Sequence, residues 1–257
     1  MRIAVAGGSG VAGRYVVEAA RAAGHDPVVL SRSAGVDLRR DEGVVAALRS
    51  VEVIVDTTNP RTTSGAKATA FFTDVTRRLQ AAGAAAGVAR LVTLSIVGLE
   101  RVPGFGYYEA KLAQERAAAD GPLPVTVVRA TQFHEFPAEL LTRSMRGPVA
   151  LMPVMRIQPV AARSVGEILV EVASGPPPDA IVEVAGPERE DLVDLARRLL
   201  RRHGRRALVL PLPVPGAAGR AMRSGAQRPT NGARIVGPTF EAWLGSPDAA
   251  PAALRER

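Results

Sequence analysis

Three side chains in the middle of the chain have types and a spacing that suit acid–base chemistry. Tyr107 and Lys111 lie four residues apart in an expected helix, so they share one helix face. A phenol held near an ammonium has its phenolate form stabilised, and it can then exchange a proton near neutral pH. Ser95 directly follows an apolar run and is expected to hydrogen-bond the same substrate oxygen. We predict a proton-transfer site centred on Tyr107, with Tyr108, three residues from Lys111, as the alternative phenol.

A glycine-rich segment follows the first apolar run and opens the first expected helix. Its spacing is Gly7-x-x-Gly10-x-x-Gly13, with Ser9 and Val11 between the glycines. A phosphate bound at a helix N-terminus must approach backbone N–H groups closely, and residues without a Cβ allow this approach. The third glycine lets the helix pack tightly against the strand. At the first strand–helix junction, the segment predicts a cradle for the pyrophosphate of a dinucleotide.

The end of the second expected strand indicates which dinucleotide binds. Ser31, Arg32 and Ser33 stand about 20 residues beyond the glycines, where an acidic residue would bind the ribose diol of NAD. A guanidinium flanked by hydroxyls suits a 2′-phosphate, so we expect NADP(H); the alternative is that Arg32 is one of many surface arginines. Position alone suggests further contacts: Asp37 near the adenine amino group and, on the other side of the cofactor, Thr57, Thr58 and Asn59.

The elements that must position these residues alternate along the first half of the chain. Short β-branched runs that are apolar on both faces, as in strands buried in a parallel sheet, occur at 3–6, 28–30, 53–55, 91–94 and 125–128. Stretches rich in alanine and other helix formers lie between them, at 13–23, 42–48, 66–86 and 109–119. This alternation predicts an α/β fold, a doubly wound parallel sheet with helices on both faces.

The second half of the chain has a looser pattern that many prolines interrupt. Helical periodicity returns at 140–141, 165–172 and 192–200, strand-like pieces occur at 181–184 and 207–210, and Pro176–Pro178 indicates a stiff surface connection. We expect residues 1–130 to form the cofactor-binding core and residues 131–245 to form a small C-terminal substrate lobe, interleaved with the core in one structural unit. Residues 246–257 are expected to be a frayed tail.

The segment after the fifth expected strand contains the candidate ligand contacts of this lobe. Thr131 and Phe133 are expected beside the cofactor, and Gln132, His134 and Phe136 beside the substrate. His134 has two interpretations that the sequence leaves open. It is either a substrate contact or proton relay, or a packed loop histidine bonded to the backbone.

These features resemble the atypical short-chain dehydrogenase/reductases, in particular their NmrA-like NAD(P)H-binding group. The resemblance rests on the glycine spacing, on Ser31-Arg32-Ser33, on Ser95, on Tyr107-x-x-x-Lys111 and on the stretches 129–136 and 158–165, and it extends to about Glu188. It implies a Rossmann-type fold, NADP(H) binding and, in active members, hydride transfer to a carbonyl or double bond. It also implies cofactor contacts at Gly7, Gly10, Gly13 and Arg32 and a catalytic triad of Ser95, Tyr107 and Lys111.

Composition bounds the remaining possibilities. The chain has 257 residues, of which 47% are hydrophobic and 23% charged, as in a globular protein. It has no cysteine, which excludes disulfides and thiol nucleophiles, and we expect no metal site. The net charge of +8 comes from arginines spread along the chain, with Lys67 and Lys111 as the only lysines. Because the aromatic share is only 4%, this charge does not predict a nucleic-acid partner.

The expected location and partners follow from the same survey. No apolar run is long enough to span a membrane, and the chain begins directly with a strand pattern, so we expect a cytoplasmic protein with no membrane contact. We expect a monomer or homodimer that acts on a small molecule.

The sequence therefore predicts an NADP(H)-dependent oxidoreductase. A hydride would pass to or from a carbonyl, quinone or activated double bond of a small apolar molecule. One alternative is a non-catalytic NADP(H)-sensing regulator, which has no use for the Tyr107–Lys111 pair. Another is an epimerase or isomerase that retains its cofactor, which Arg32 disfavours because such enzymes usually hold NAD.

Overall fold

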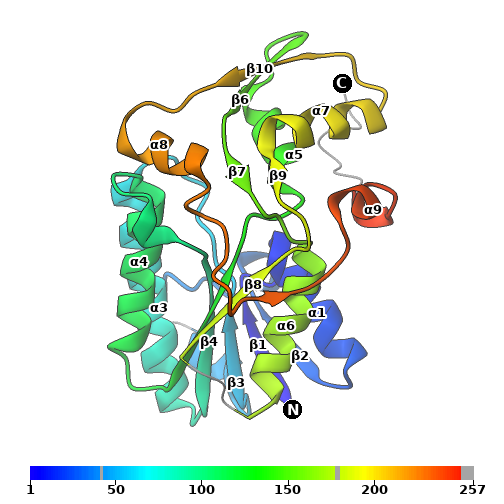
Figure 1. Ribbon diagram of the computed structural model, residues 1–257. Coiled ribbons are helices and arrows are strands. Elements are labelled where there is room, and N and C mark those ends of the chain that lie inside the picture. Colours follow the sequence, from blue (N-terminus) through cyan, green and yellow to red (C-terminus); the bar gives the residue numbers. More distant parts are fainter. Residues whose placement is uncertain (41–42, 177–179, 250–257) are drawn as a thin grey trace. The chain divides into compact units, whose positions relative to one another are not determined.

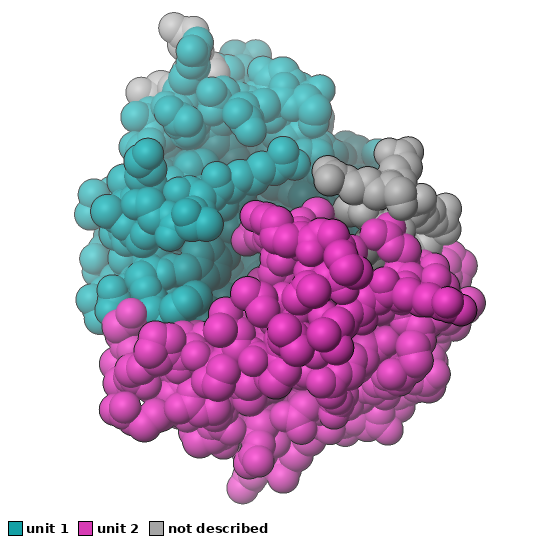
Figure 2. Space-filling view, turned by 90° about the horizontal axis from the view of Figure 1, so that it is seen from above, with its two compact units in different colours: residues 1–96, 105–129, 162–182 teal, residues 97–104, 130–161, 183–257 magenta. Residues whose placement is uncertain are grey.

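The computed structural model describes residues 1–40, 43–176 and 180–249, in two compact units (Figure 2). Unit 1 contains residues 1–96, 105–129 and 162–182, and unit 2 contains residues 97–104, 130–161 and 183 onward. The two units thus alternate along the chain, and the segment 162–182 of the expected lobe belongs to unit 1. Of the expected tail, the Ser246 hydroxyl donates to the Trp243 carbonyl, and Pro247–Ala249 forms a short 3-10 turn with Ala249 buried. Residues 250–257 lie outside the described residues, as do Pro177 and Pro178.

A seven-stranded sheet with the order β11-β8-β5-β4-β3-β1-β2 confirms the predicted α/β class. Its strands are β1 (Arg2–Ala6), β2 (Asp26–Leu30), β3 (Val53–Asp56), β4 (Arg90–Ile96), β5 (Val125–Ala130), β8 (Ile181–Ala185) and β11 (Arg234–Ile235). Parallel pairing joins β1 to β2 and β3, β3 to β4, and β8 to β11. The strand order reverses at β1, which makes the sheet doubly wound in the Rossmann manner. Ligands of such sheets bind beyond the carboxyl ends of the strands at this reversal.

Helices cover both faces of the sheet in unit 1, as the alternating pattern predicts. Figure 1 shows α1 (Val11–Ala22) and α6 (Ala162–Ser174) on one side, and α3 (Gly65–Ala85) and α4 (Gly106–Ala119) on the other. Glycine makes both helix pairs close. A Cβ on Gly166 of α6 would stand 2.8 Å from Tyr15 of α1, and one on Gly65 would stand 2.9 Å from the Cα of Gly106. The expected helix at 42–48 is a single turn, α2 (Val44–Ala47), and Glu42 lies outside the described residues.

Unit 2 contains two small sheets and amphipathic helices. β6 (Val149–Pro153) pairs in parallel with β10 (Leu208–Leu212), and β7 (Arg156–Ile157) pairs antiparallel with β9 (Glu190–Asp191). Its helices are α5 (Phe136–Ser144), α7 (Leu192–Arg202), α8 (Gly216–Ser224) and α9 (Phe240–Leu244), and its 3-10 turns include Leu99–Arg101. On α7 the leucines are buried and most arginines exposed, so the densest arginine run is a solvated helix face. No helix in the described ranges combines the length and apolar character needed to cross a membrane.

A buried glutamine joins α3 to the end of α4. The side-chain Nε2 of Gln80 donates to the Ala118 carbonyl at 2.7 Å, and its Oε1 accepts from the Leu123 backbone N–H at 2.8 Å. Gln80 is 1% exposed, so water cannot replace these bonds. The glutamine therefore satisfies two backbone groups at the point where α4 ends and the chain turns toward β5.

Replacing Gln80 by methionine is expected to lower the free energy of unfolding by about 3 kcal/mol, because two buried backbone groups lose their partners. Chemical denaturation at neutral pH measures this change. The control is Arg77→Met on an exposed position of the same helix, with an expected change below about 0.5 kcal/mol. Equal stabilities of the two variants would contradict the assigned role.

Candidate active site

Parallel register brings the candidate cofactor residues to one edge of the sheet. Ala6 of β1 is level with Leu30 of β2 and with Asp56 of β3, and Asp56 is level with Thr93 of β4. The residues that follow these four positions therefore lie together at the carboxyl ends of the strands. They include Gly7, Ser31, Arg32, Thr57, Thr58, Asn59 and Ser95.

The glycine segment forms a turn in which side chains would collide with backbone. Gly7 has φ +76°, in the left-handed region that favours glycine, and its carbonyl accepts from the Gly10 N–H at 2.8 Å. A Cβ on Gly13 would stand 2.2 Å from the Gly7 oxygen and 2.7 Å from the Thr57 hydroxyl. No side chain caps the first turn of α1, which begins at Val11. The turn thus combines close backbone approach with the electropositive start of a twelve-residue helix, the features that a phosphate requires.

Arg32 lies in a 3-10 turn, Arg32–Ala34, directly after β2. Its side chain is exposed, and no carboxylate among the described residues forms an ion pair with it. Ser31 and Ser33 lie on either side in sequence, with their hydroxyls 2.9 Å apart. The guanidinium and the two hydroxyls therefore lie at the same end of β2, and the guanidinium has no acidic competitor in the described part of the chain.

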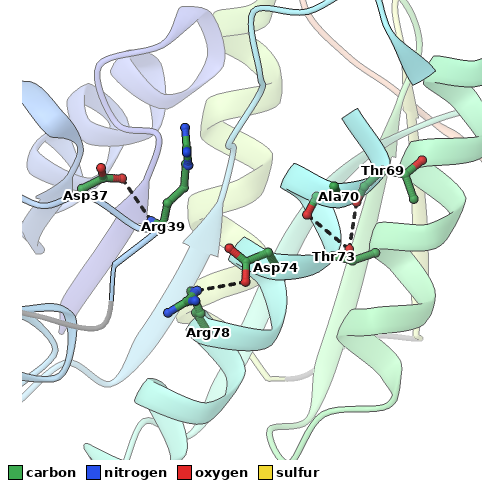
Figure 3. A network of polar contacts seen from close by, with 7 residues as sticks. All are labelled: Asp37, Arg39, Thr69, Ala70, Thr73, Asp74 and Arg78. Atoms are coloured by element: carbon green, nitrogen blue, oxygen red, sulfur yellow. Dashed lines mark hydrogen bonds and ion pairs between the residues drawn. The ribbon is translucent and has the colours of Figure 1, made fainter. Parts of the chain in front are cut away.

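Asp37 and Thr57, two further candidate cofactor contacts, form hydrogen bonds with other residues of the protein. The Asp37 carboxylate accepts from the Arg39 backbone N–H at 3.1 Å, as Figure 3 shows, and lies 3.9 Å from the Arg40 guanidinium. Figure 3 also shows the nearby part of α3, where Thr73 donates to the helix backbone and Arg78 pairs with Asp74. The Thr57 hydroxyl donates to the Ala6 carbonyl at 2.8 Å and so braces β3 against β1. The Asp37 contacts thus stabilise the turn that follows β2, and the Thr57 contact stabilises the edge of the sheet.

Tyr107 reaches the loop after β3 from the first turn of α4. Its hydroxyl donates to the side-chain oxygen of Asn59 at 3.0 Å, and its ring packs edge-to-face on Phe72 with the centroids 5.9 Å apart. The contact between Gly65 and Gly106 brings the starts of α3 and α4 together and so allows this reach. Tyr108 is 6% exposed, and its ring lies 4.5 Å from that of Phe105. Tyr107, by contrast, is only half-buried.

Lys111 is buried, with its ammonium at the carboxyl end of β4. Nζ donates to the Leu94 carbonyl at 2.7 Å and to Oε1 of Gln114, and it lies 4.6 Å from the centroid of the Phe72 ring. Burial lowers the pKa of Lys111 from 10.5 to about 8, while the negative charges of Asp56 and Glu115 act to raise it. The same Phe72 ring therefore touches both members of the Tyr107–Lys111 pair.

Asp56 is the acidic group of this cluster, and sequence reasoning did not single it out. Its side chain is fully buried. Oδ1 accepts from the N–H and the hydroxyl of Thr58, at 2.9 and 2.7 Å, and Oδ2 accepts from Gln114 Nε2 at 2.9 Å. Gln114 thus bridges Asp56 and Lys111, with its N–H toward the carboxylate and its oxygen toward the ammonium. An acidic residue at the end of an apolar strand, directly before Thr57, was the available signal for Asp56; Gln114 had none beyond its place one turn after Lys111.

Ser95 is buried two residues beyond the register position of Asp56. The residue is 2% exposed, and its hydroxyl finds no hydrogen-bond partner in the part of the chain that the structure describes. Buried hydroxyls are normally bonded, so an unpaired one at this edge is an available donor and acceptor. Its neighbour Leu94 supplies the carbonyl that holds Lys111. The Lys111 ammonium is therefore bound to the residue directly before Ser95 in β4.

The remaining candidates lie in unit 2, after β5. The Thr131 hydroxyl donates to the Gln158 carbonyl at 2.6 Å, Phe133 forms a parallel bridge with Val160, and Phe136 begins α5. Gln132 is 8% exposed, and within the described residues neither end of its amide is hydrogen-bonded. Among these candidates, the Gln132 amide and Nδ1 of His134 are buried without a hydrogen-bond partner in the described ranges.

His134 is packed among aromatic rings of unit 2. The residue is 1% exposed, its Nε2 lies 3.1 Å from the Pro238 carbonyl, and the rings of Phe240 and Trp243 lie 5.4 and 5.5 Å away. A carbonyl only accepts, so Nε2 carries the proton in the neutral ring. Burial lowers the pKa of His134 from 6.5 to about 4, the Pro238 bond raises it, and the charge of Arg198 lowers it. The geometry favours the packed-histidine interpretation over the proton relay.

Acid is expected to destabilise the fold through His134. Because its pKa is lower in the folded than in the unfolded chain, the unfolded chain binds the extra proton as the pH falls from 6.5 toward 4. Between about pH 7 and pH 5, the wild type should lose about 2 kcal/mol more of its unfolding free energy than His134→Phe. Denaturant titrations at the two pH values measure this difference. His25→Gln, at a half-exposed histidine, is the control that keeps the wild-type loss, and equal losses in His134→Phe and wild type would contradict the assignment.

Comparison with known proteins identifies the fold. Neither a protein-family model nor a curated protein matches the sequence. Solved structures do match. An NADPH-dependent quinone oxidoreductase from Escherichia coli, complexed with NADPH, is 17% identical with a TM-score of 0.71, over 95% of this chain and 98% of that chain. A short-chain dehydrogenase/reductase superfamily protein from Agrobacterium tumefaciens with bound NAD is 19% identical with a TM-score of 0.68, over 99% and 97%. A UDP-N-acetylglucosamine 4-epimerase from Bacillus cereus is 17% identical with a TM-score of 0.67, over 88% and 95%. At these identities the likeness shows a shared Rossmann-type fold and no more.

Proposed function

We propose that this protein is an NADP(H)-dependent oxidoreductase that reduces a carbonyl, a quinone or an activated double bond of a small molecule. The observation that carries the proposal is the coincidence of two features at one sheet edge. A glycine turn open to phosphate stands at the end of β1, and a hydroxyl-bearing acid–base cluster stands at the ends of β3 and β4. The fold likeness adds support, because its members include an NADPH-dependent quinone oxidoreductase.

The residues at the end of β1 and β2 fit a 2′-phosphorylated dinucleotide. The pyrophosphate would lie against the uncapped start of α1, where Gly7 and Gly13 leave no room for side chains. Arg32 would hold the 2′-phosphate with Ser31 and Ser33, since no carboxylate stands at this position to bind a ribose diol. Among similar structures one binds NADPH and another NAD, so the preference for NADP(H) rests on these residues of the chain itself.

The chemistry divides between the cofactor and the protein. When bound, the nicotinamide supplies a hydride, which is a proton together with two electrons. The Tyr107 hydroxyl would supply the proton for the substrate oxygen, which completes the two-electron reduction of a carbonyl to an alcohol or of a quinone to a hydroquinone. The unpaired hydroxyl of Ser95 would hydrogen-bond that oxygen as it gains charge. The buried ammonium of Lys111 and the ring of Tyr107 both contact the Phe72 ring, so the positive charge would act on the phenol from the same part of α4.

The surroundings of Tyr107 suit a proton donor better than those of Tyr108. Its hydroxyl lies at the carboxyl end of β3, bonded to an exposed asparagine that a substrate can displace. Tyr108 is buried against Phe105.

A regulator that only senses NADP(H) is the second candidate. It would bind the cofactor through the same glycine turn and Arg32 without oxidising it.

Cofactor choice is expected to depend on Arg32. Replacing it by glutamine removes the charge opposite the 2′-phosphate and should weaken NADPH binding about 10- to 100-fold, with little effect on NADH. Titration of nicotinamide fluorescence or calorimetry measures both affinities. Arg21→Gln, at the far end of α1, should bind NADPH like the wild type. If the wild type binds neither dinucleotide, the proposed function is wrong.

Proton transfer is expected to depend on the Tyr107 hydroxyl. Tyr107→Phe should lower kcat by about 10²- to 10⁴-fold in NADPH oxidation with a panel of quinones and carbonyls, because the acid is lost while the ring contact with Phe72 stays. Tyr108→Phe should stay within a few-fold of the wild type. The reverse result would assign the proton to Tyr108, and cofactor binding without turnover on the whole panel would favour the sensor.

A further inference from the structure

We infer that Asp56 and Gln114 are positioning residues for Lys111: Gln114 holds the ammonium at the carboxyl end of β4, and Asp56 holds the Gln114 amide in the orientation that this requires. The functional part of this inference rests on the proposed function, because it matters only where the Lys111 charge supports proton transfer at Tyr107. The structural part concerns three buried side chains of unit 1 and is independent of any ligand.

The geometry of the amide carries the inference. An amide has one accepting and one donating end, and here the two ends face opposite charges. Oε1 of Gln114 accepts from Lys111, and Nε2 donates to Oδ2 of Asp56 at 2.9 Å. The three residues are 5% exposed or less, so no bulk water competes for these bonds. Rotating the amide by 180° would turn its N–H groups toward the ammonium and its oxygen toward the carboxylate. Both contacts would then be repulsive, so the two charges determine the orientation of the amide.

The ammonium has few alternatives to this arrangement. From β4 it meets a neutral carbonyl, that of Leu94, and from α3 the face of the Phe72 ring. Charged groups facing it come from β3, which supplies Asp56, and from its own helix α4, which supplies Glu115. Glu115 is itself bound by Arg129 of β5, with an oxygen 2.6 Å from the guanidinium, so its charge is largely balanced. Asp56, reached through Gln114, is the charge that remains to offset burial.

Asp56 also connects Lys111 to the loop that meets Tyr107. The same carboxylate accepts twice from Thr58, the residue before Asn59, and Asn59 accepts from the Tyr107 hydroxyl. Asp56 is thus linked to the Lys111 ammonium through Gln114, and to the Tyr107 phenol through Thr58 and the adjacent Asn59. We therefore expect a substitution of Gln114 to affect the Lys111 ammonium and the Tyr107 phenol, although Gln114 itself would not contact substrate or cofactor.

The lysine content of the chain permits a direct test. Lys67 and Lys111 are the only lysines, so NMR of protein labelled with ¹³C and ¹⁵N in lysine shows two side chains. Lys67 is exposed and serves as the internal reference, and Lys67→Arg assigns the signals. In the wild type, Lys111 should titrate near pH 8. Gln114→Met keeps the volume but removes the acceptor, and it should lower the Lys111 midpoint by about one pH unit or more.

Two further variants make the result decisive. Gln114→Glu restores an oxygen acceptor, so the Lys111 midpoint should return to the wild-type value or rise above it. Leu112→Met, with the same new residue on the same helix, should leave the midpoint unchanged. If Gln114→Met titrates like the wild type while it remains folded by circular dichroism, Gln114 does not hold the ammonium and the inference fails.

The functional part has its own readout in the pH profile of NADPH oxidation with 1,4-naphthoquinone as the probe. Activity should fall as the pH rises through the Lys111 midpoint, and Gln114→Met should move that limb downward by the same interval as the NMR midpoint. A limb that stays fixed while the midpoint moves would overturn the functional part. Absence of turnover in the wild type would overturn the proposed function instead, and the NMR titration would still decide whether Asp56 and Gln114 hold Lys111.

Discussion

The buried carboxylate of Asp56 is the interaction on which the candidate site depends. A carboxylate removed from water is stable only where hydrogen bonds replace its hydration. Asp56 has such bonds from three elements: the loop after β3 through Thr58, α4 through Gln114, and α3 through a 3.5 Å contact from the Thr76 hydroxyl. Each donor must stand at hydrogen-bond distance from a carboxylate at the carboxyl end of an interior strand of the sheet. The loop and both helices are therefore positioned by one group at the end of β3.

The contact between α3 and α4 is the second constraint, and it complements the first. Gly65 and Gly106 let the starts of the two helices approach until a Cβ on either would touch backbone. This approach places Phe72 of α3 between two residues of α4, with its ring against both Tyr107 and Lys111. An apolar ring beside the ammonium excludes water from it, and this lowers the pKa of the lysine. Helix packing and electrostatics thus act on the same pair of side chains.

The order of elements and the edge of the sheet that bears the site could be predicted from the sequence, because both follow from local patterns. Apolar runs such as Ile3–Ala6 and Val53–Val55 have the period and length of buried strands, and Gly7, Ser31 and Ser95 directly follow such runs. The contacts within the site could not be predicted, since they join residues far apart in the chain. Gln114 meets Asp56 across 58 positions, and His134 meets Pro238 across 104. No local pattern encodes which polar side chains will be buried together, and so Asp56 and Gln114 passed unnoticed while His134 stayed ambiguous.

The choice of lysine at position 111 follows from the shape of its site. In a chain that uses arginine almost everywhere, a lysine stands where two acceptors, the Leu94 carbonyl and Gln114 Oε1, meet an aromatic face. An arginine would bring five donors in a rigid plane to these two acceptors, and its remaining N–H groups would be buried without partners. An arginine also stays protonated throughout the physiological range, whereas the pKa of Lys111, near 8, lies within reach of neutral pH. A buried ammonium costs stability, and this one packs on the same aromatic ring as a half-exposed phenol, which agrees better with the proposed proton transfer than with a structural cation.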